Sequence, residues 1–374
     1  MKFSVSSTTL CSRLQTISRV QSSKNALPIL DCVLFEVSDG ELTLTASDSE
    51  TTIVTKVEIT DVEGAGKVAI ESKQLINSIK EISEQPIIFN INDSTYQIEI
   101  NYQNGKYNLI AQSGDEYPVP GAANNASNST TFPSALLLNG ITRSLFATAD
   151  DELRPQMNGV YFDLDPEYAT LVASDGHKLV RNRILSVHSD SPCSFILPKK
   201  PSVMLKGILP KEQGDVEIHF DERNAEIILS NYKINCRLIE GRFPNYNSVI
   251  PQDNPFRVTV DRLSFISALR RVSVFASVSS SLIKLQLTDN TLTVSAQDLD
   301  FSTSAEERIN CEYMGMPMSI GFNGPFLLEV LNSITATEVV LELADPSRAG
   351  VIVPAEQGEE EDLIMLLMPM MLQD

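Results

Sequence analysis

The sequence predicts an α+β protein made of three repeated domains, each with two short helices packed against antiparallel sheets. Three observations lead to this prediction. Short runs of alternating apolar residues, rich in Val, Ile and Thr, recur about every 8–12 residues with turn residues between them. Helical periodicity occurs twice in each third of the chain. Independent sequence landmarks also return at a nearly constant interval.

The interval between landmarks defines the repeat. Similar strand-like segments end at Ser47, Ser174 and Ser295, which are 127 and 121 residues apart. The dipeptides Tyr117-Pro118 and Phe243-Pro244 are 126 residues apart. One shared period predicts three homologous domains joined by short polar linkers. The predicted domains cover residues 1–122, 123–252 and 253–374.

The six predicted helices each have a single apolar face, which we expect to pack on a sheet. The residues of these faces are Leu10, Leu14 and Ile17; Leu75, Ile79 and Ile82; Leu137, Ile141 and Leu145; Val203, Gly207 and Ile208; Phe265, Leu269 and Val272; and Leu327, Leu331 and Ile334.

Charge separates the helices from the rest of the chain. The six helical segments with their flanking residues hold 13 of the 29 Lys and Arg residues, but only 2 of the 49 Asp and Glu residues. The helices therefore carry a net charge of +11, although the whole chain has −20. A basic helical surface on an acidic protein can hold a polyanion while the other surfaces repel it. Because the helices are rich in Lys, Arg, Ser and Thr, sequence-independent phosphate contact is favoured over base recognition.

Composition limits the class of protein. The chain is 42% hydrophobic and 21% charged, which is typical of a soluble globular protein. We expect no membrane span and no secretory signal in the opening segment MKFSVSSTTL. Five scattered Cys without a CxxC pair predict reduced thiols in a cytoplasmic protein.

No catalytic or metal-binding motif is present. The three His form no metal-like pair, and P-loop, GxGxxG, GxSxG and HExxH patterns are missing, so we expect no metal, no cofactor and no enzyme activity. Asp175-Gly176 favours a turn. The acidic run Glu356–Asp362 is expected to be a solvated loop, with an acidic metal site as the less favoured alternative.

Five motifs spread over the whole chain carry a family resemblance. They are Leu27–Leu30, Glu152–Gly159, Ala173–Leu179, Gly241–Val249 and Met368–Leu372. Together with the threefold repeat, they resemble the bacterial DNA polymerase processivity clamp, the beta subunit of the replicative DNA polymerase III. The resemblance implies three clamp domains per chain and a head-to-tail homodimer that forms a ring around double-stranded DNA, with helices inside and strands outside.

The resemblance also implies partners and sites. The partners would be the DNA polymerase III catalytic subunit, the clamp loader complex, and other polymerases and repair proteins that carry clamp-binding peptides. By the family pattern, Lys24, Lys73 and Arg154 lie near DNA; from charge alone we add Lys199, Lys200, Arg270 and Arg271. A merely solvated side chain remains the alternative for each. The residues that match the subunit interface are Tyr107, Leu109, Val274 and Phe275, with core packing as the alternative.

A hydrophobic pocket for partner peptides is implied in the same way, between the second and third domains. Without the resemblance, the C-terminal Leu and Met residues would be assigned to the core. The residues that match the pocket are Met157, Ser174, Gly176, His177, Lys178, Leu179, Pro244, Val249, Gly350, Leu366, Leu367, Met368, Pro369 and Met370.

The sequence departs from the family pattern at three places. Met371 stands where the family usually has Arg, Pro155-Gln156 stands where some members have two DNA-contacting Tyr, and two further residues follow the usual end. Two other classes of protein fit the sequence less well. An aspartic protease needs two Asp-Thr/Ser-Gly turns, which Asp48-Ser49-Glu50 and Asp175-Gly176 do not provide. An adhesion scaffold is opposed by the scattered Cys.

Overall fold

The computed structural model describes residues 1–22, 25, 27–38, 40–118 and 128–372. The chain divides into two compact units. The first unit comprises Met1–Ala135 and Val203–Leu238, and the second comprises Leu136–Ser202 and Ile239–Asp374. The predicted boundary at 122/123 lies outside the described residues.

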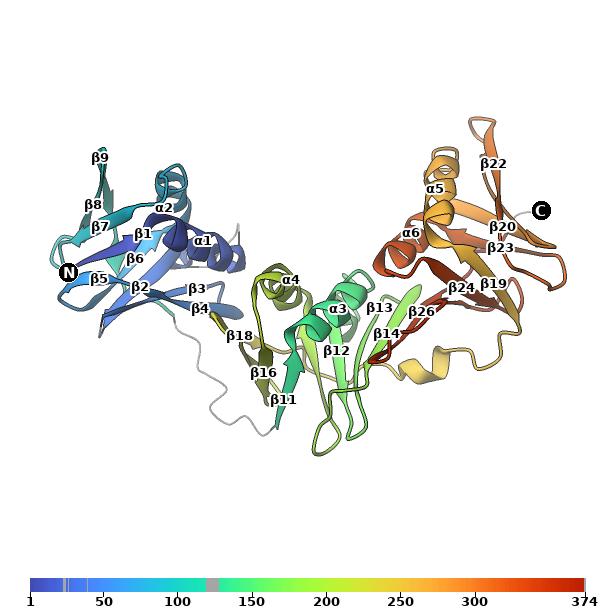
Figure 1. Cartoon of the computed structure of the whole chain (residues 1–374), viewed down its shortest axis with the longest axis horizontal. Coiled ribbons are helices and arrows are strands. Elements are labelled where there is room, and N and C mark those ends of the chain that lie inside the picture. Colours follow the sequence, from blue (N-terminus) through green and yellow to red (C-terminus); the bar gives the residue numbers. More distant parts are fainter. Residues whose placement is uncertain (23–24, 26, 39, 119–127, 373–374) are drawn as a thin grey trace. The chain divides into compact units, whose positions relative to one another are not determined.

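The first unit contains two antiparallel sheets (Figure 1). The five-stranded sheet has the order β5 (Thr60–Glu63), β1 (Lys2–Ser6), β7 (Pro86–Ile91), β8 (Gln97–Tyr102) and β9 (Gly105–Ile110). The nine-stranded sheet has the order β10 (Gln112–Ser113), β6 (Gly66–Glu71), β2 (Cys32–Ser38), β3 (Glu41–Ser47), β4 (Thr51–Glu58), β18 (Tyr232–Arg237), β17 (Asn224–Ile228), β16 (Asp215–Phe220) and β11 (Asn128–Pro133).

The second unit also contains two antiparallel sheets. The eight-stranded sheet has the order β15 (Cys193–Pro198), β12 (Gly159–Leu164), β13 (Ala169–Ser174), β14 (Lys178–Ile184), β26 (Glu361–Leu367), β25 (Gly350–Pro354), β24 (Glu338–Leu343) and β19 (Phe256–Asp261). The four-stranded sheet has the order β22 (Thr303–Asn310), β21 (Thr291–Asp298), β20 (Leu282–Thr288) and β23 (Met318–Asn323).

Neighbouring repeats are joined by strand pairing. We call the pairing of β4 with β18 the first junction and the pairing of β14 with β26 the second junction. The strands of the second repeat thus pair with both neighbours. For this reason the compact units divide the chain within the second repeat instead of between repeats.

Within the described residues there are six α-helices, as predicted, and each follows directly from a strand. They are α1 (Ser7–Ile17), α2 (Ser72–Ile79), α3 (Ser134–Leu145), α4 (Lys199–Ile208), α5 (Arg262–Ser273) and α6 (Gly324–Ser333). In four of them the last strand residue caps the helix, because its side chain accepts hydrogen bonds from free N–H groups of the first turn. These caps are Ser6, Glu71, Asp261 and Asn323.

The predicted apolar faces are buried in five helices, which confirms their assignment to the core. For α4 the prediction is right at Ile208, which is buried, and wrong at Val203 and Gly207, which are exposed. Met204 and Leu205 are buried in their place. These two residues precede Ile208 by four and three positions, a spacing that keeps all three side chains on one side of the helix.

The landmark dipeptides have equivalent roles. Tyr117 packs with Leu30 and Ala69 in the first unit, and Phe243 packs with Val172 and Leu179 in the second. All five Cys are free thiols. Burial raises the pKa of the Cys32 thiol to about 11, so it stays protonated at neutral pH. Within the described residues, no helix is long and apolar enough to cross a membrane.

Candidate functional site

Two predicted phosphate-binding residues lie exposed on helices. Lys73 is in the first turn of α2, and Arg270 is near the end of α5. In the first unit α2 lies beside α1, and in the second unit α6 lies beside α5 (Figure 1). Because their apolar faces are buried, the cationic side chains on the opposite faces are free to meet a ligand in solvent.

Three other predicted cations are held by carboxylates. Lys199 Nζ lies 2.6 Å from Asp150, and Arg154 Nε lies 2.8 Å from Asp151. Arg271 donates through Nε to Glu307 at 2.9 Å, and this contact raises the pKa of Arg271. A DNA phosphate would have to compete with these carboxylates, which are themselves solvated enough to be displaced.

The last two predicted cations are Lys24 and Lys200. Lys24 lies outside the described residues, and Lys200 is half-buried at the start of α4. Four further exposed cations on or just after helices were not predicted as DNA contacts, namely Arg19, Lys80, Lys206 and Lys211. These cations were part of the net charge of +11 counted for the helical segments. That charge count is the sequence signal from which they could have been predicted.

The predicted peptide-binding residues gather around the second junction. Ser174 to Leu179 form the tight turn between β13 and β14, in which Asp175 accepts hydrogen bonds from the N–H groups of His177 and Lys178 at 2.8 and 2.9 Å. This geometry confirms that Asp175-Gly176 is a turn. The His177 carbonyl accepts a hydrogen bond from Met368 N–H at 2.8 Å, which ties the turn to the C-terminal segment.

The strand register separates these residues into two groups. Ser174, Leu179 and Leu366 are directly opposite one another in β13, β14 and β26, so their side chains share one sheet face. Lys178, Leu367 and Gly350 share the opposite face. The first group therefore faces one side of the sheet and the second group faces the other side.

The first group belongs to a small apolar cluster. Leu179 and Leu366 pack with Phe243, Tyr246 and Ile250, which come from the end of the second repeat. Around this cluster Val249 is 56% exposed and Met368 is 43% exposed. The other predicted members differ in exposure: Met157 is buried, Pro369 and Met370 are half-buried, and Gly176, His177 and Pro244 are exposed.

The second group is deeply buried. Leu367 is fully buried in the main core of the second unit, and a side chain at Gly350 would meet the ring of Phe322. Lys178 is also buried, with its amine 2.8 Å from Glu329 and 4.0 Å from the ring centroid of Phe326. These contacts compensate the desolvation of the ammonium group.

The predicted solvated loop is confirmed for residues 356–360 of the acidic run, which are exposed, but is wrong for its last two residues, which form ion pairs. Glu361 and Asp362 begin β26, where Glu361 lies 2.7 Å from Arg143 and Asp362 pairs with Arg181. Desolvation lowers the pKa of the Arg181 guanidinium, and the charge of Asp362 opposes this shift. A cavity of 730 Å³ lies beside the Arg143–Glu361 pair. Within the described residues, no group of three or more His, Cys, Asp or Glu could hold a metal ion.

The predicted interface residues lie near two free sheet edges. Tyr107 and Leu109 are on β9, the edge strand of the five-stranded sheet; Tyr107 is half-buried and Leu109 is buried. Val274 and Phe275 follow α5, with 79% and 39% exposure. In the second unit the edge strands of the four-stranded sheet are β22 and β23, and β23 makes an isolated bridge from Gly321 to Met370.

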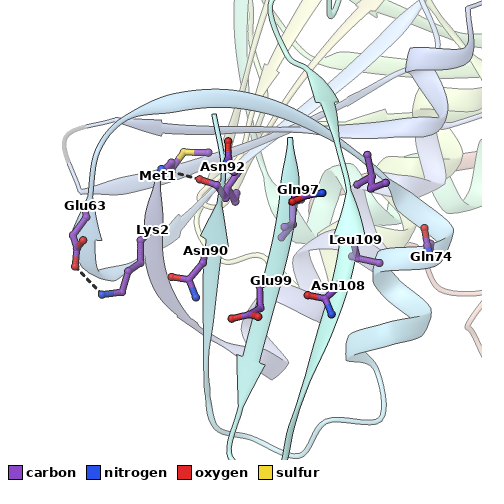
Figure 2. A pocket seen from close by; sticks show the side chains of 13 residues that line it. Met1, Lys2, Glu63, Gln74, Asn90, Asn92, Gln97, Glu99, Asn108 and Leu109 are labelled. Atoms are coloured by element: carbon purple, nitrogen blue, oxygen red, sulfur yellow. Dashed lines mark hydrogen bonds and ion pairs between the residues drawn. The ribbon is translucent and has the colours of Figure 1, made fainter. Parts of the chain in front are cut away.

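A cavity of 990 Å³ extends across the five-stranded sheet, from Met1, Lys2 and Glu63 to the end of β9 (Figure 2). Polar side chains from four neighbouring strands form one row across it, because Lys2, Asn90, Glu99 and Asn108 are directly opposite one another. Figure 2 shows Leu109 on β9 and Gln74 on α2 beside this row.

Comparison with known proteins agrees with the threefold repeat. Family models described as the N-terminal, central and C-terminal domains of the DNA polymerase III beta subunit match residues 1–120, 131–245 and 247–371. Beta sliding clamps of Pseudomonas aeruginosa and Haemophilus influenzae are 25% and 26% identical to the chain, with both chains fully covered. A crystal structure of a DNA polymerase sliding clamp from Pseudomonas aeruginosa is 25% identical, covers both chains fully and has a TM-score of 0.93.

Proposed function

The chain belongs to the DNA polymerase III beta subunit family, the sliding clamps, and from this premise we propose how its own residues carry out the function of the family. As a sliding clamp it is a non-catalytic processivity subunit in DNA replication. In our proposal, two chains close head to tail around double-stranded DNA. The enclosed duplex is then retained by topology, so the protein needs only weak contacts with it.

Exposed helix cations provide the proposed DNA contact. Lys73 and Arg270 are the leading residues, with Arg19, Lys80 and Lys206 beside them in the same role. Arg154, Lys199 and Arg271 would join by exchanging a carboxylate for a phosphate. Such contacts are independent of base sequence and weaken with salt, which permits sliding.

Retention on circular DNA tests this proposal. A clamp loaded by its loader should remain on closed circular DNA and leave when the circle is cut. Lys73→Ala with Arg270→Ala should lower loading several-fold, whereas Lys284→Ala, an exposed cation on β20, should not. Equal loss from circular and linear DNA would contradict enclosure.

The free edges of β9 and β22 support the head-to-tail dimer. Ala111 N–H donates to Tyr96 at 2.8 Å, so the odd residues of β9 bond inward and Lys106, Asn108 and Ile110 present free N–H and C=O groups. At the end of β22 the Cys311 N–H donates to the Asn290 carbonyl, so the odd-numbered residues of this strand bond to β21. The backbone N–H and C=O groups of Ser304, Glu306 and Arg308 therefore point away from the sheet. Each edge is thus ready to pair with another strand.

Charge selects the register of this proposed pairing. Placing Lys106 opposite Glu306 joins opposite charges and sets Asn108 opposite Ser304, while a slip of two residues sets Lys106 opposite Arg308. In the favoured register, Tyr107 lies opposite Ala305 on the face of β22 from which Glu307 contacts α5. Val274 and Phe275 directly follow α5, which lies on the same face. In the proposed dimer they would therefore meet Tyr107 and Leu109 of the other subunit and form one apolar contact with them.

Partner binding is proposed at the second junction. An apolar side chain of a clamp-binding peptide would enter between Val249 and Met368 and rest on Leu179 and Leu366. Flexible Met and Leu side chains suit several partners. We propose as partners the DNA polymerase III catalytic subunit, the clamp loader complex, and other polymerases and repair proteins with such peptides. Five free thiols support a cytoplasmic location.

A further inference from the structure

The turn between β21 and β22 holds two large apolar side chains in solvent. Leu299 is 72% exposed and Phe301 is 77% exposed. The turn itself is well defined, because the buried Asp298 carboxylate accepts hydrogen bonds from the N–H groups of Asp300 and Phe301 at 3.0 and 3.2 Å. Two apolar side chains fixed in water on a structured turn favour a contact with another surface.

A matching surface lies on the first unit. The 990 Å³ groove crosses the sheet to the end of β9, where its lining includes Gln97, Leu109 and Ile110 (Figure 2). Ile110 is 75% exposed at the last position of β9, whereas Ile98 and Leu109 are buried. Ile110 is therefore the exposed apolar side chain at this end of the groove.

The strand register brings these two features together between two copies of the chain. If Lys106 lies opposite Glu306, then continuing the antiparallel pairing places Ile110 opposite Ser302, the residue next to Phe301. The β21–β22 turn of one copy then comes over the end of β9 in the other. Three large side chains that are each mostly exposed in one chain would leave water in the same contact.

We propose that Leu299 and Phe301 of one protomer seat in the groove beside Ile110 of the other protomer, extending the dimer interface beyond its paired strands. The inference rests on the proposed head-to-tail dimer and adds to it a second apolar contact. The occupant of the groove is a second copy of this chain, because the turn and the groove both lie on the continuation of the same pair of strand edges. This contact makes the turn a determinant of how long the ring stays closed.

Cross-linking between two variants tests the register. One chain carries Ile110→Cys and the other Ser302→Cys, both with Cys193→Ser because Cys193 is the half-buried native thiol. Directly opposite positions lie within disulfide reach. Oxidation by diamide should link the mixed chains into a covalent dimer, while each variant alone should not link. Linking of Ile110→Cys alone, or no linking of the mixture, would overturn the proposal.

Dimer affinity tests the apolar contact itself. Leu299→Ser with Phe301→Ser should raise the dissociation constant of the dimer about tenfold or more in sedimentation velocity. Leu153→Ser is the matched control, since Leu153 is 92% exposed in the second repeat and should leave the constant unchanged. If the unmodified chain is a dimer and the double variant binds equally well, the proposed contact is overturned while the dimer stands. If the unmodified chain is a monomer at micromolar concentration, both are overturned.

Discussion

At the first junction β4 pairs with β18, and at the second junction β14 pairs with β26, each by an antiparallel ladder that makes one continuous sheet. The side chains differ greatly. The first junction carries neutral groups such as Thr55, whose hydroxyl donates to the Asn231 carbonyl at 2.8 Å, and its ion pair of Arg237 with Glu50 is exposed to solvent. The second carries ion pairs of Arg143 with Glu361 and of Arg181 with Asp362.

The threefold repeat explains the strand pairing at both junctions, but it does not explain the difference between their side chains. Backbone pairing satisfies the strand edges equally at both junctions, so closing the sheet requires no charged side chains. Ion pairs at such depth lose much of their benefit to desolvation. The second junction, which holds the candidate peptide site, has such buried pairs, whereas the Arg237–Glu50 pair of the first junction is exposed. We infer that the buried pairs have a local role and fix β26, which leads into Met368.

The largest expected effect comes from removing the carboxylate of Asp362. Asp362→Ala leaves the guanidinium of Arg181, whose side chain is 9% exposed, without its ion partner. We expect a loss of roughly 2–3 kcal/mol in unfolding free energy, since an uncompensated charge stays buried. Thr55→Ala at the first junction loses one hydrogen bond and should cost about 1 kcal/mol. Urea unfolding followed by circular dichroism measures both, and equal losses would contradict the comparison.

A pair of double-mutant cycles isolates the ion pairs themselves. Arg143 and Glu361 are 15% and 12% exposed, whereas Arg237 and Glu50 at the first junction are 57% and 63% exposed and 4.0 Å apart. The buried pair should show a coupling energy of about 1–3 kcal/mol, and the exposed pair below about 0.5 kcal/mol. Alanine replacements and thermal unfolding supply the four stabilities of each cycle. A larger coupling for the exposed pair would reverse our interpretation of the two junctions.

Partner binding should distinguish the junctions in function. Val249→Ala with Met368→Ala should weaken binding of a labelled peptide from the polymerase catalytic subunit about tenfold in fluorescence polarisation, because both exposed side chains would contact it. Leu27→Ala removes a similarly exposed apolar side chain, 49% exposed, from the first repeat and should have no effect. Equal weakening by both changes would place the peptide elsewhere.

The sequence predicted the features that depend on period and order. The repeat interval and five of the six buried helix faces follow from alternation and helical spacing. In α4 the assignment of Val203 and Gly207 was wrong because Met204 and Leu205 fit a helical spacing with Ile208 equally well. The ion pairs of Glu361 and Asp362 were missed because Arg181 lies 181 residues before Asp362, and Arg143 lies even further from Glu361. No local pattern reports such a contact.

The candidate peptide site could be predicted from the sequence only through the family resemblance of its motifs. Which of its side chains share a sheet face is shown only by the structure. Alternation along β14 assigns Lys178 and Leu179 to opposite faces, yet the sequence does not reveal which face is open. That depends on Phe243 and Tyr246, which reach the sheet from a segment more than 60 residues later.

The smallest effect is expected for Glu329→Gln, which tests whether every ion pair at the second junction is equally demanding. Glu329 is 45% exposed, so its carboxylate is partly solvated and gains little from the pair with Lys178. After the change, the buried ammonium keeps Asp175 at 3.4 Å and the Phe326 ring at 4.0 Å. We therefore expect a loss of at most about 1 kcal/mol in urea unfolding. A loss as large as that of Asp362→Ala would mean that Lys178 depends on Glu329 alone, and that depth of burial is not what separates the strong pairs from the weak ones.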